Sequence, residues 1–258
     1  MDGESTRQRY EDICRRIDEA KARSGRSHDR VHLVAVTKYA AMDQIRELID
    51  MGHVDLGEGR LQHFQKVCPQ VEEYLERQRS MGQVNAPEQA RWHFIGHLQR
   101  NKVRKILPHV RLIHSVDSLR LAEEIQSAAE QLDRQIEILV QINPTDDRKR
   151  HGIAPAAVKH LIDQIQTMVT IRVRGLMAMA PPVEDPEDAR PVFQRVEEIF
   201  SEIRRSGAGG DGFDILSMGM TNDFEVAVEC GANIVRVGSG IFGTNEVTEA
   251  ASPEQAEA

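Results

Sequence analysis

Eight short runs of β-branched and other apolar residues alternate regularly with helical stretches along this chain. Several runs are apolar at nearly every position, as is typical of parallel strands that are buried on both faces. This alternation predicts a closed (β/α)8 TIM barrel, with an open doubly wound sheet as the alternative, and eight units favour the barrel. The predicted strands span residues 31–37, 54–57, 92–95, 112–115, 136–142, 171–177, 214–217 and 234–237.

The domain organisation follows from the helices and from two segments that break the alternation. Ile13 and Ile17 stand at helical spacing within an extra N-terminal helix over residues 5–24, which Gly25 ends. We expect a surface loop over residues 78–90, one barrel domain over 1–245 and a disordered tail over 246–258. The other predicted helices lie near residues 42–51, 60–77, 100–107, 118–133, 155–168, 187–205 and 222–230.

The composition argues against several classes of partner. A net charge of −8 is unlike that of proteins that coat nucleic acid, and the basic run 148–150, flanked by Asp146 and Asp147, is more typical of a solvated loop than of an anion site. The N-terminus lacks the apolar core of a signal peptide, and no apolar run has the length of a membrane span. We therefore expect a cytoplasmic protein that binds neither nucleic acid nor membranes.

Lys38 is the first candidate functional residue, because it ends the first strand. Active sites of (β/α)8 barrels lie at the carboxyl ends of the strands. Desolvation lowers the pKa of an amine and frees it to attack a carbonyl group. The alternative is an ordinary lysine whose apolar stem is buried while its amine reaches solvent.

Residues at the ends of the last two strands indicate an anion site. Gly238 and Ser239 follow the eighth strand, where small residues let backbone N–H groups approach a phosphate, and Ser217 ends the seventh. The alternative is a tight turn that needs glycine for its backbone angles. Arg236 lies inside the eighth strand, so it requires either a buried ion pair or a ligand. Residues 236, 238 and 240 share one side of that strand, which favours the ligand.

Other catalytic patterns are missing. His93 and His97 are four residues apart, a spacing that makes a metal pair on a helix but not on the strand predicted here, so we expect no metal site. Glu58 has no obvious carboxylate partner for paired acid–base hydrolysis. Neither a G-x-S-x-G elbow nor a phosphate-binding P-loop occurs in the sequence.

The motifs at these positions resemble the pyridoxal phosphate homeostasis proteins (the YggS/PROSC family). The resemblance runs in family order from about residue 31 to residue 243, and its most specific parts are W-H-F-I-G-x-L-Q-x-N-K and L-S-x-G-M-[ST]-x-D. The matching segments begin at Ala35, Gly57, Trp92, His114, Val140, Gly152, Arg174, Leu216 and Val235.

The resemblance implies a barrel like the N-terminal domain of alanine racemase that holds pyridoxal 5′-phosphate (PLP). It implies that Lys38 forms the internal aldimine, a Schiff base with the cofactor. It also implies that Ser217, Gly238 and Ser239 bind the phosphate and that Arg236 faces the pyridine nitrogen. Asn143 and Met177, at the ends of the fifth and sixth strands, complete the predicted cofactor site.

Two departures from the family pattern concern loops of this site. Gly59 stands where the family commonly has asparagine, so we expect no polar contact from that position. Tyr39-Ala40-Ala41 lacks the proline that often follows the lysine in the family, so the loop beside Lys38 is expected to have a different shape.

The arginine opposite the pyridine nitrogen argues for a carrier and against an enzyme. A permanently charged guanidinium disfavours protonation of that nitrogen, so carbanions would be poorly stabilised. A racemase of this fold takes its second acid–base group from another domain and the partner subunit, and we expect neither here. The sequence therefore predicts a monomeric, non-catalytic PLP carrier that supplies apo-enzymes, with no catalytic residues. The alternatives are a racemase-like PLP enzyme and a barrel that binds another phosphorylated metabolite.

Overall fold

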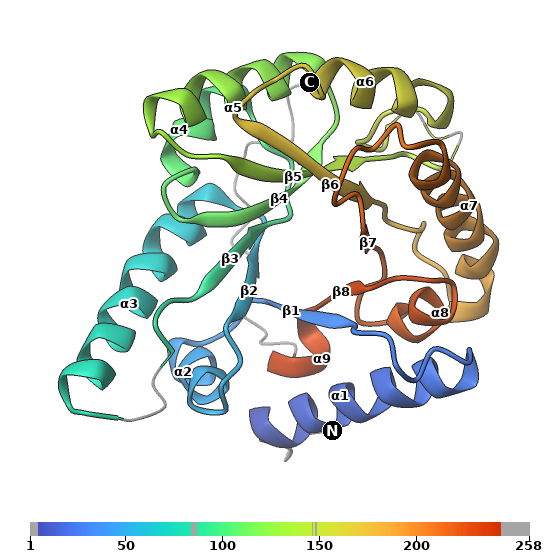
Figure 1. The fold of residues 1–258 in the computed structure, drawn as a ribbon. Helices are drawn as coiled ribbons and strands as arrows, with labels where there is room; N and C mark the ends of the chain where they lie inside the picture. The colour runs from blue at the N-terminus through green and yellow to red at the C-terminus, as the bar shows by residue number, and fades with distance from the viewer. Residues whose placement is uncertain (1–4, 84–86, 146, 148, 244–258) are drawn as a thin grey trace.

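In the computed structural model the eight predicted strands form one closed ring of parallel strands, in the order β1 to β8 with β8 paired to β1 (Figure 1). The structure describes residues 5–83, 87–145, 147 and 149–243. Closure confirms the predicted (β/α)8 barrel and excludes the open sheet. The strands are β1 (His32–Val36), β2 (Asp55–Glu58), β3 (Arg91–Phe94), β4 (Val110–Val116), β5 (Ile136–Gln141), β6 (Ile171–Met177), β7 (Ile215–Ser217) and β8 (Ile234–Val237).

Helices surround the ring on its outside (Figure 1). The predicted extra helix at the N-terminus is confirmed as α1, capped by the Ser5 side chain, which accepts from the Gln8 N–H. None of the helices described is both long and apolar enough to cross a lipid bilayer. The helices are α1 (Thr6–Arg23), α2 (Met42–Asp50), α3 (Leu61–Ser80), η1 (Arg100–Lys102), α4 (Val103–Ile106), α5 (Leu119–Gln131), η2 (Pro155–Ala157), α6 (Val158–Ile165), η3 (Pro186–Ala189), α7 (Arg190–Ser206), α8 (Phe224–Glu229) and α9 (Ser239–Phe242).

The loop predicted to start at residue 78 starts three residues later, because α3 continues to Ser80. Gln78 is buried in the last turn of this helix, where its amide donates to the Asp50 carboxylate of α2 and to the Tyr74 hydroxyl. Tertiary contacts thus extend a helix past the point where its apolar pattern ends. Residues 84–86 of this loop, residues 146 and 148 of the basic loop, and the whole predicted tail lie outside the described residues.

Apolar side chains fill both sides of the ring. A large core lies between strands and helices and includes Phe64 and Trp92, whose rings meet edge to face at 5.2 Å. A second, smaller core fills the inside of the barrel. The barrel is therefore packed rather than hollow, as in other proteins of this fold. The inner core consists of Val34, Leu112, Leu139, Met177 and Ile234.

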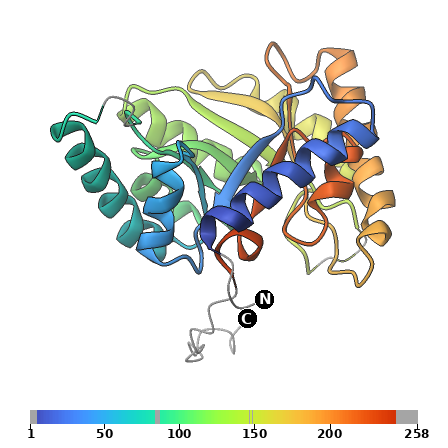
Figure 2. The same ribbon diagram turned by 90° about the horizontal axis from the view of Figure 1, so that it is seen from below.

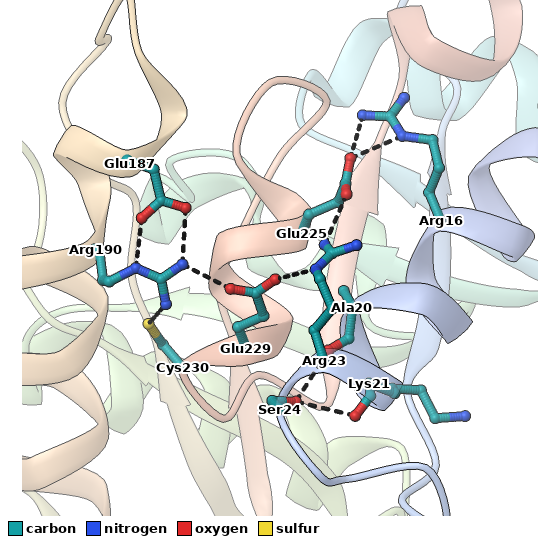
Figure 3. Close-up of polar contacts among 10 residues, drawn as sticks. All are labelled: Arg16, Ala20, Lys21, Arg23, Ser24, Glu187, Arg190, Glu225, Glu229 and Cys230. Carbon is teal, nitrogen blue, oxygen red and sulfur yellow. Dashed lines mark hydrogen bonds and ion pairs between the residues drawn. The ribbon is translucent and has the colours of Figure 1, made fainter.

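Helix α1 packs across α8 and α9, the last helices described (Figure 2). A chain of ion pairs joins it to α8 and α7 (Figure 3). Glu225 accepts from Arg16 and Arg23, and Glu229 accepts from Arg23 and Arg190. Glu225 thus holds two arginines of α1, and Glu229 holds one arginine of α1 and one of α7, which ties the N-terminal helix to the end of the barrel sequence.

Candidate functional site

Four of the seven predicted site residues surround one cavity of about 210 Å³ at the carboxyl ends of β1 and β8. They are Lys38, Arg236, Gly238 and Ser239. A larger hollow of about 860 Å³ lies between α7 and α8, but none of the predicted residues lines it. The other residues that line the smaller cavity are Val36, Tyr39, Ile95, Met179, Met220, Thr221, Phe242 and Gly243.

Lys38 leaves the end of β1 in a fixed direction, because the residue before it is anchored. Thr37 is fully buried, and its hydroxyl lies 3.0 Å from a Glu58 carboxylate oxygen and 3.2 Å from the Gly57 carbonyl oxygen of β2. Lys38 itself is half-buried, with its Nζ 4.4 Å from the centre of the Tyr39 ring. Within the described part of the chain this amine forms no ion pair, so an incoming aldehyde would not have to displace a carboxylate.

Glu58 is a structural anchor of this corner. Its carboxylate accepts hydrogen bonds from the N–H groups of Gly59 and Arg60 and contacts Nδ1 of His63 at 2.6 Å. Burial alone would raise the pKa of Glu58, but the bonds from His63 and the two N–H groups hold it below its ordinary value. The carboxylate thus stays charged and fixes the β1–β2 end beside Lys38.

Hydrogen-bond donors converge on the Thr221 hydroxyl oxygen at the start of α9, in the lining of the cavity that Lys38 also lines. The N–H groups of Gly238 and Gly240 both lie 3.4 Å from the Thr221 hydroxyl oxygen, and the Ser239 hydroxyl lies 3.3 Å from it. These contacts to Thr221 are long, and a phosphate in the cavity would accept hydrogen bonds from the same backbone donors in its place. We call the donors of Gly238, Ser239 and Gly240 the cradle.

The glycines of this cradle are favoured by space and not by backbone angles. Gly238 has a φ of −114°, so the turn that needs a left-handed glycine is not found at that position. A Cβ on Gly238 would lie 3.3 Å from the Val36 carbonyl oxygen, and one on Gly240 would lie 3.0 Å from a Val237 methyl carbon. Small residues therefore let the backbone approach its neighbours closely.

Helix α9 is held at its other end by the N-terminal helices. Arg9 of α1 donates to the carbonyl oxygen of Ile241 at 2.7 Å, and Gln44 of α2 donates to that of Phe242 at 2.9 Å. These bonds satisfy carbonyl groups at the end of the helix. The N–H groups at its start are thereby kept in a fixed position against the cavity.

Arg236 is 3% exposed and uses neutral acceptors. It donates to the Ser217 hydroxyl oxygen at 2.5 Å and to the Ala178 carbonyl oxygen at 3.0 Å. Among the described residues it forms no ion pair, so the buried ion pair considered above is not found. Burial lowers the pKa of Arg236 to about 10, partly opposed by the nearby Asp223 carboxylate. A guanidinium in this state is a costly group unless a ligand contacts it.

A line of hydrogen bonds runs from Arg236 through the inside of the barrel. The Ser217 hydroxyl lies 2.9 Å from Nδ1 of His114, whose Nε2 lies 3.0 Å from Nδ1 of His93, and Nε2 of His93 lies 3.2 Å from the Asp55 carboxylate. Arg236 can only donate and Asp55 only accepts. With both rings uncharged, each bond therefore donates in the direction of Asp55.

The electrostatics of this line keep His114 uncharged and Asp55 negative. Burial lowers the pKa of His114 well below its ordinary value, and the nearby His93 and Arg236 lower it further. Burial would raise the pKa of Asp55, but His93 and Arg91 hold it below its ordinary range. The line links the cavity at Lys38 with a hollow of about 390 Å³ at the opposite, amino-terminal end of the strands.

The other three predicted residues do not reach the cavity. Ser217 is fully buried beneath Arg236 and contacts it through the hydrogen bond described above. Asn143 organises its own loop, since its side chain donates to the carbonyl oxygens of Asp147 and Arg150. Met177 belongs to the core inside the barrel.

Thr221, by contrast, was not among the predicted contacts although it stands at the centre of the cradle. A signal for it existed in the sequence, because it fills the [ST] position of the motif that starts at Leu216. The segment alone gives no reason to choose its last hydroxyl over Ser217. Only the packing of α9 makes that choice.

At the first of the two departures from the family pattern, two glycines lie against each other. A Cβ on Gly59 would lie 3.3 Å from the Gly96 Cα, and one on Gly96 would lie 2.1 Å from the Gly59 carbonyl oxygen. The loops after β2 and β3 thus touch through two glycines. In the loop after β1, the Tyr39 ring takes its place beside the Lys38 amine.

Comparison with known proteins gives a consistent result. Residues 13–246 match the family model described as alanine racemase, N-terminal domain. The chain is 34% identical over 236 residues to the pyridoxal phosphate homeostasis protein of Aquifex aeolicus, covering 92% of this chain and 96% of that protein.

Two solved structures extend the similarity to the fold. A protein from Bifidobacterium adolescentis superposes with a TM-score of 0.80 at 33% identity, covering 92% of this chain and 94% of that one. PipY of Synechococcus elongatus, solved with PLP bound, gives a TM-score of 0.69 at 32% identity, covering 88% of this chain and all of that one. The likeness therefore spans nearly the whole length of each relative.

Proposed function

Because this chain belongs to the pyridoxal phosphate homeostasis protein family, we propose that it binds PLP at Lys38 and keeps it available for other proteins. One observation carries the proposal. The Lys38 amine, the donors around Thr221 and the buried Arg236 guanidinium surround a single cavity. The Aquifex relative, a pyridoxal phosphate homeostasis protein, and PipY, solved with PLP bound, support the same ligand.

The residues present fit the parts of this cofactor. The cradle of Gly238, Ser239 and Gly240 would hold the phosphate, with the Thr221 hydroxyl as a further partner. Arg236 would face the ring nitrogen, which can accept a hydrogen bond from a guanidinium. When bound, PLP supplies an aldehyde that forms a carbon–nitrogen double bond with an amine, and a ring that can take up electron density. Lys38 would provide the amine.

The residues around the cavity favour a carrier over an enzyme. The Arg236 guanidinium keeps its proton, so it would leave the ring nitrogen unprotonated and the ring a weak electron acceptor. Among the described residues that line the cavity there is neither a carboxylate nor an imidazole, the groups that most often transfer protons in catalysis. We propose that the protein acts as a monomer and passes PLP to apo-enzymes.

Borohydride reduction followed by peptide mapping tests the attachment. Protein loaded with PLP should give one stable adduct on the peptide that contains Lys38, and Lys38→Ala should give none. Lys102→Ala is the matched control, because Lys102 lies on the same rim but lines a different cavity. An adduct that persists in Lys38→Ala would refute the site.

Transfer and turnover assays test the role. Loaded protein should restore activity to an apo-enzyme faster than buffer does, and it should racemise amino acids at no more than the rate of free PLP. A robust racemisation rate that Lys38→Ala abolishes would overturn the carrier role and leave the binding site intact.

A further inference from the structure

We propose that His97, Asp117 and His151 form a binding site for one divalent transition-metal ion on the rim of the barrel. The ligand atoms of these three residues, two imidazole nitrogens and a carboxylate oxygen, all lie within 4.8 Å of one another. The three residues are 54 positions apart in the sequence at most, so the fold and not a local motif brings them together.

The topology explains the meeting. His97 follows β3, Asp117 follows β4 directly and His151 lies in the loop after β5. These are consecutive strands of the ring, so their carboxyl ends lie side by side. The imidazole rings of His97 and His151 stack with their centres 4.1 Å apart. This ring contact also holds the loops after β3 and β5 against each other.

The side chains can close around an ion with small movements. A tetrahedral ion with bonds of about 2.0–2.1 Å places its ligand atoms about 3.3–3.4 Å apart, so the present set must contract by roughly 1.5 Å at most. The rings are now nearly parallel, with an interplanar angle of 14°, and must turn toward a common point. Their terminal torsions are soft, and both histidines are exposed. The three side chains form no hydrogen bonds with other described residues, so binding an ion would break none.

The chemistry of the ligands selects the kind of ion. Imidazole nitrogen suits Zn²⁺, Ni²⁺, Co²⁺ and Fe²⁺, whereas Mg²⁺ and Ca²⁺ prefer sites built entirely from oxygen. Three protein ligands leave at least one coordination position open. His97 and Asp117 also line an open hollow of about 720 Å³, from which water or a small ligand can fill that position.

The site is separate from the proposed PLP cavity. None of its three residues lines that cavity, which lies at the ends of β8 and β1 on another part of the ring. The sequence expectation of no metal site rested on pairing His97 with His93, but His93 is buried inside the barrel. A bound ion would join the loops after β3, β4 and β5.

Calorimetric titration of the PLP-free, untagged protein with ZnCl₂ tests the proposal. We expect one ion per chain and no saturable binding of MgCl₂. His151→Ala and Asp117→Asn should each weaken Zn²⁺ binding at least tenfold, because even loss of an outer-shell partner costs about 10–100-fold.

His109→Ala is the matched control. Cys68, Glu72 and His109 form the other group of potential ligands found among the described residues, so this variant removes a histidine from the competing site. It should bind Zn²⁺ as the wild type does. Binding that is lost in His109→Ala but kept in His151→Ala would overturn the proposed location, and an absence of saturable Zn²⁺ binding would overturn the site.

Thermal unfolding and PLP loading provide two further readouts. Zn²⁺ should raise the Tm of the wild type and of His109→Ala, but not that of His151→Ala. PLP loading, followed by the absorbance of the lysine adduct, should be the same in all three. Failure of PLP binding in the wild type would therefore refute the proposed function and leave the proposed metal site standing. Failure of Zn²⁺ binding would refute the metal site and leave the proposed function standing.

Discussion

Replacing His114 with asparagine should flatten the pH dependence of stability between pH 7.5 and 5.0. His114 is fully buried between His93 and Ser217, and its surroundings hold its pKa well below the ordinary value of about 6.5. Below pH 6.5 the unfolded chain therefore binds a proton at this position that the native state does not bind. Acidification consequently favours unfolding.

The magnitude follows from proton linkage. One such histidine lowers the free energy of unfolding by about 1.4 kcal/mol per pH unit below pH 6.5, which amounts to about 2 kcal/mol at pH 5.0 and almost nothing at pH 7.5. Burial also lowers the pKa of His53, so the wild type should lose more than this amount in total. Asp55 does not interfere, because the stability from a carboxylate with a lowered pKa is lost only at more acidic pH.

Urea denaturation of PLP-free protein at several pH values measures the effect. The variant costs stability at every pH, so the quantity to compare is the slope of the unfolding free energy against pH. Below pH 6.5, the slope for His114→Asn should become smaller than that of the wild type by an amount that approaches about 1.4 kcal/mol per pH unit at pH 5.0. His160→Asn, which removes an exposed histidine of α6, serves as the control. Equal slopes for the wild type and His114→Asn would refute the claim that this imidazole is held uncharged.

Three further predictions concern packing and charge. Ser217→Ala should lower the free energy of unfolding by about 2–4 kcal/mol, because it leaves the Arg236 guanidinium without one of its two acceptors. A change below about 1 kcal/mol in urea denaturation would contradict that geometry. Gly96→Ala should destabilise the protein far more than Gly59→Ala. The new Cβ at position 96 would lie 2.1 Å from a carbonyl oxygen, whereas the one at position 59 would lie 3.3 Å from its nearest neighbour. Similar melting temperatures of the two variants would count against the close approach of these loops. Glu229→Gln should lower the free energy of unfolding by about 0.5–1 kcal/mol at low salt and by less in about 1 M NaCl, since it removes ion pairs at the partly exposed junction of α1, α7 and α8. A loss of stability that does not change with salt would argue against an electrostatic role.

The sequence by itself determined the barrel and the amine at its mouth. Eight apolar strands that alternate with helices favour a closed ring, in which every strand is paired on both edges and covered on both faces. This pattern is local enough to be read from the chain. That Lys38, Arg236, Gly238 and Ser239 lie around one cavity could be predicted because each stands at or near a strand end. Their expected roles toward a cofactor came from the family resemblance. The carboxyl ends of the strands lie together at one end of a barrel, independently of the conformation of the loops.

Only the tertiary structure decided which hydroxyl completes the cradle and where the buried polar groups lie. Ser217 and Thr221 belong to the same motif, but the position of α9 sets Thr221 against the N–H groups and leaves Ser217 beneath Arg236. His93 and His97 are neighbours in the sequence, yet one lies inside the ring and the other on its rim. Side-chain partners across a closed sheet depend on register and on loop paths. These are set by packing over long sequence distances, so a local pattern of residues does not contain them.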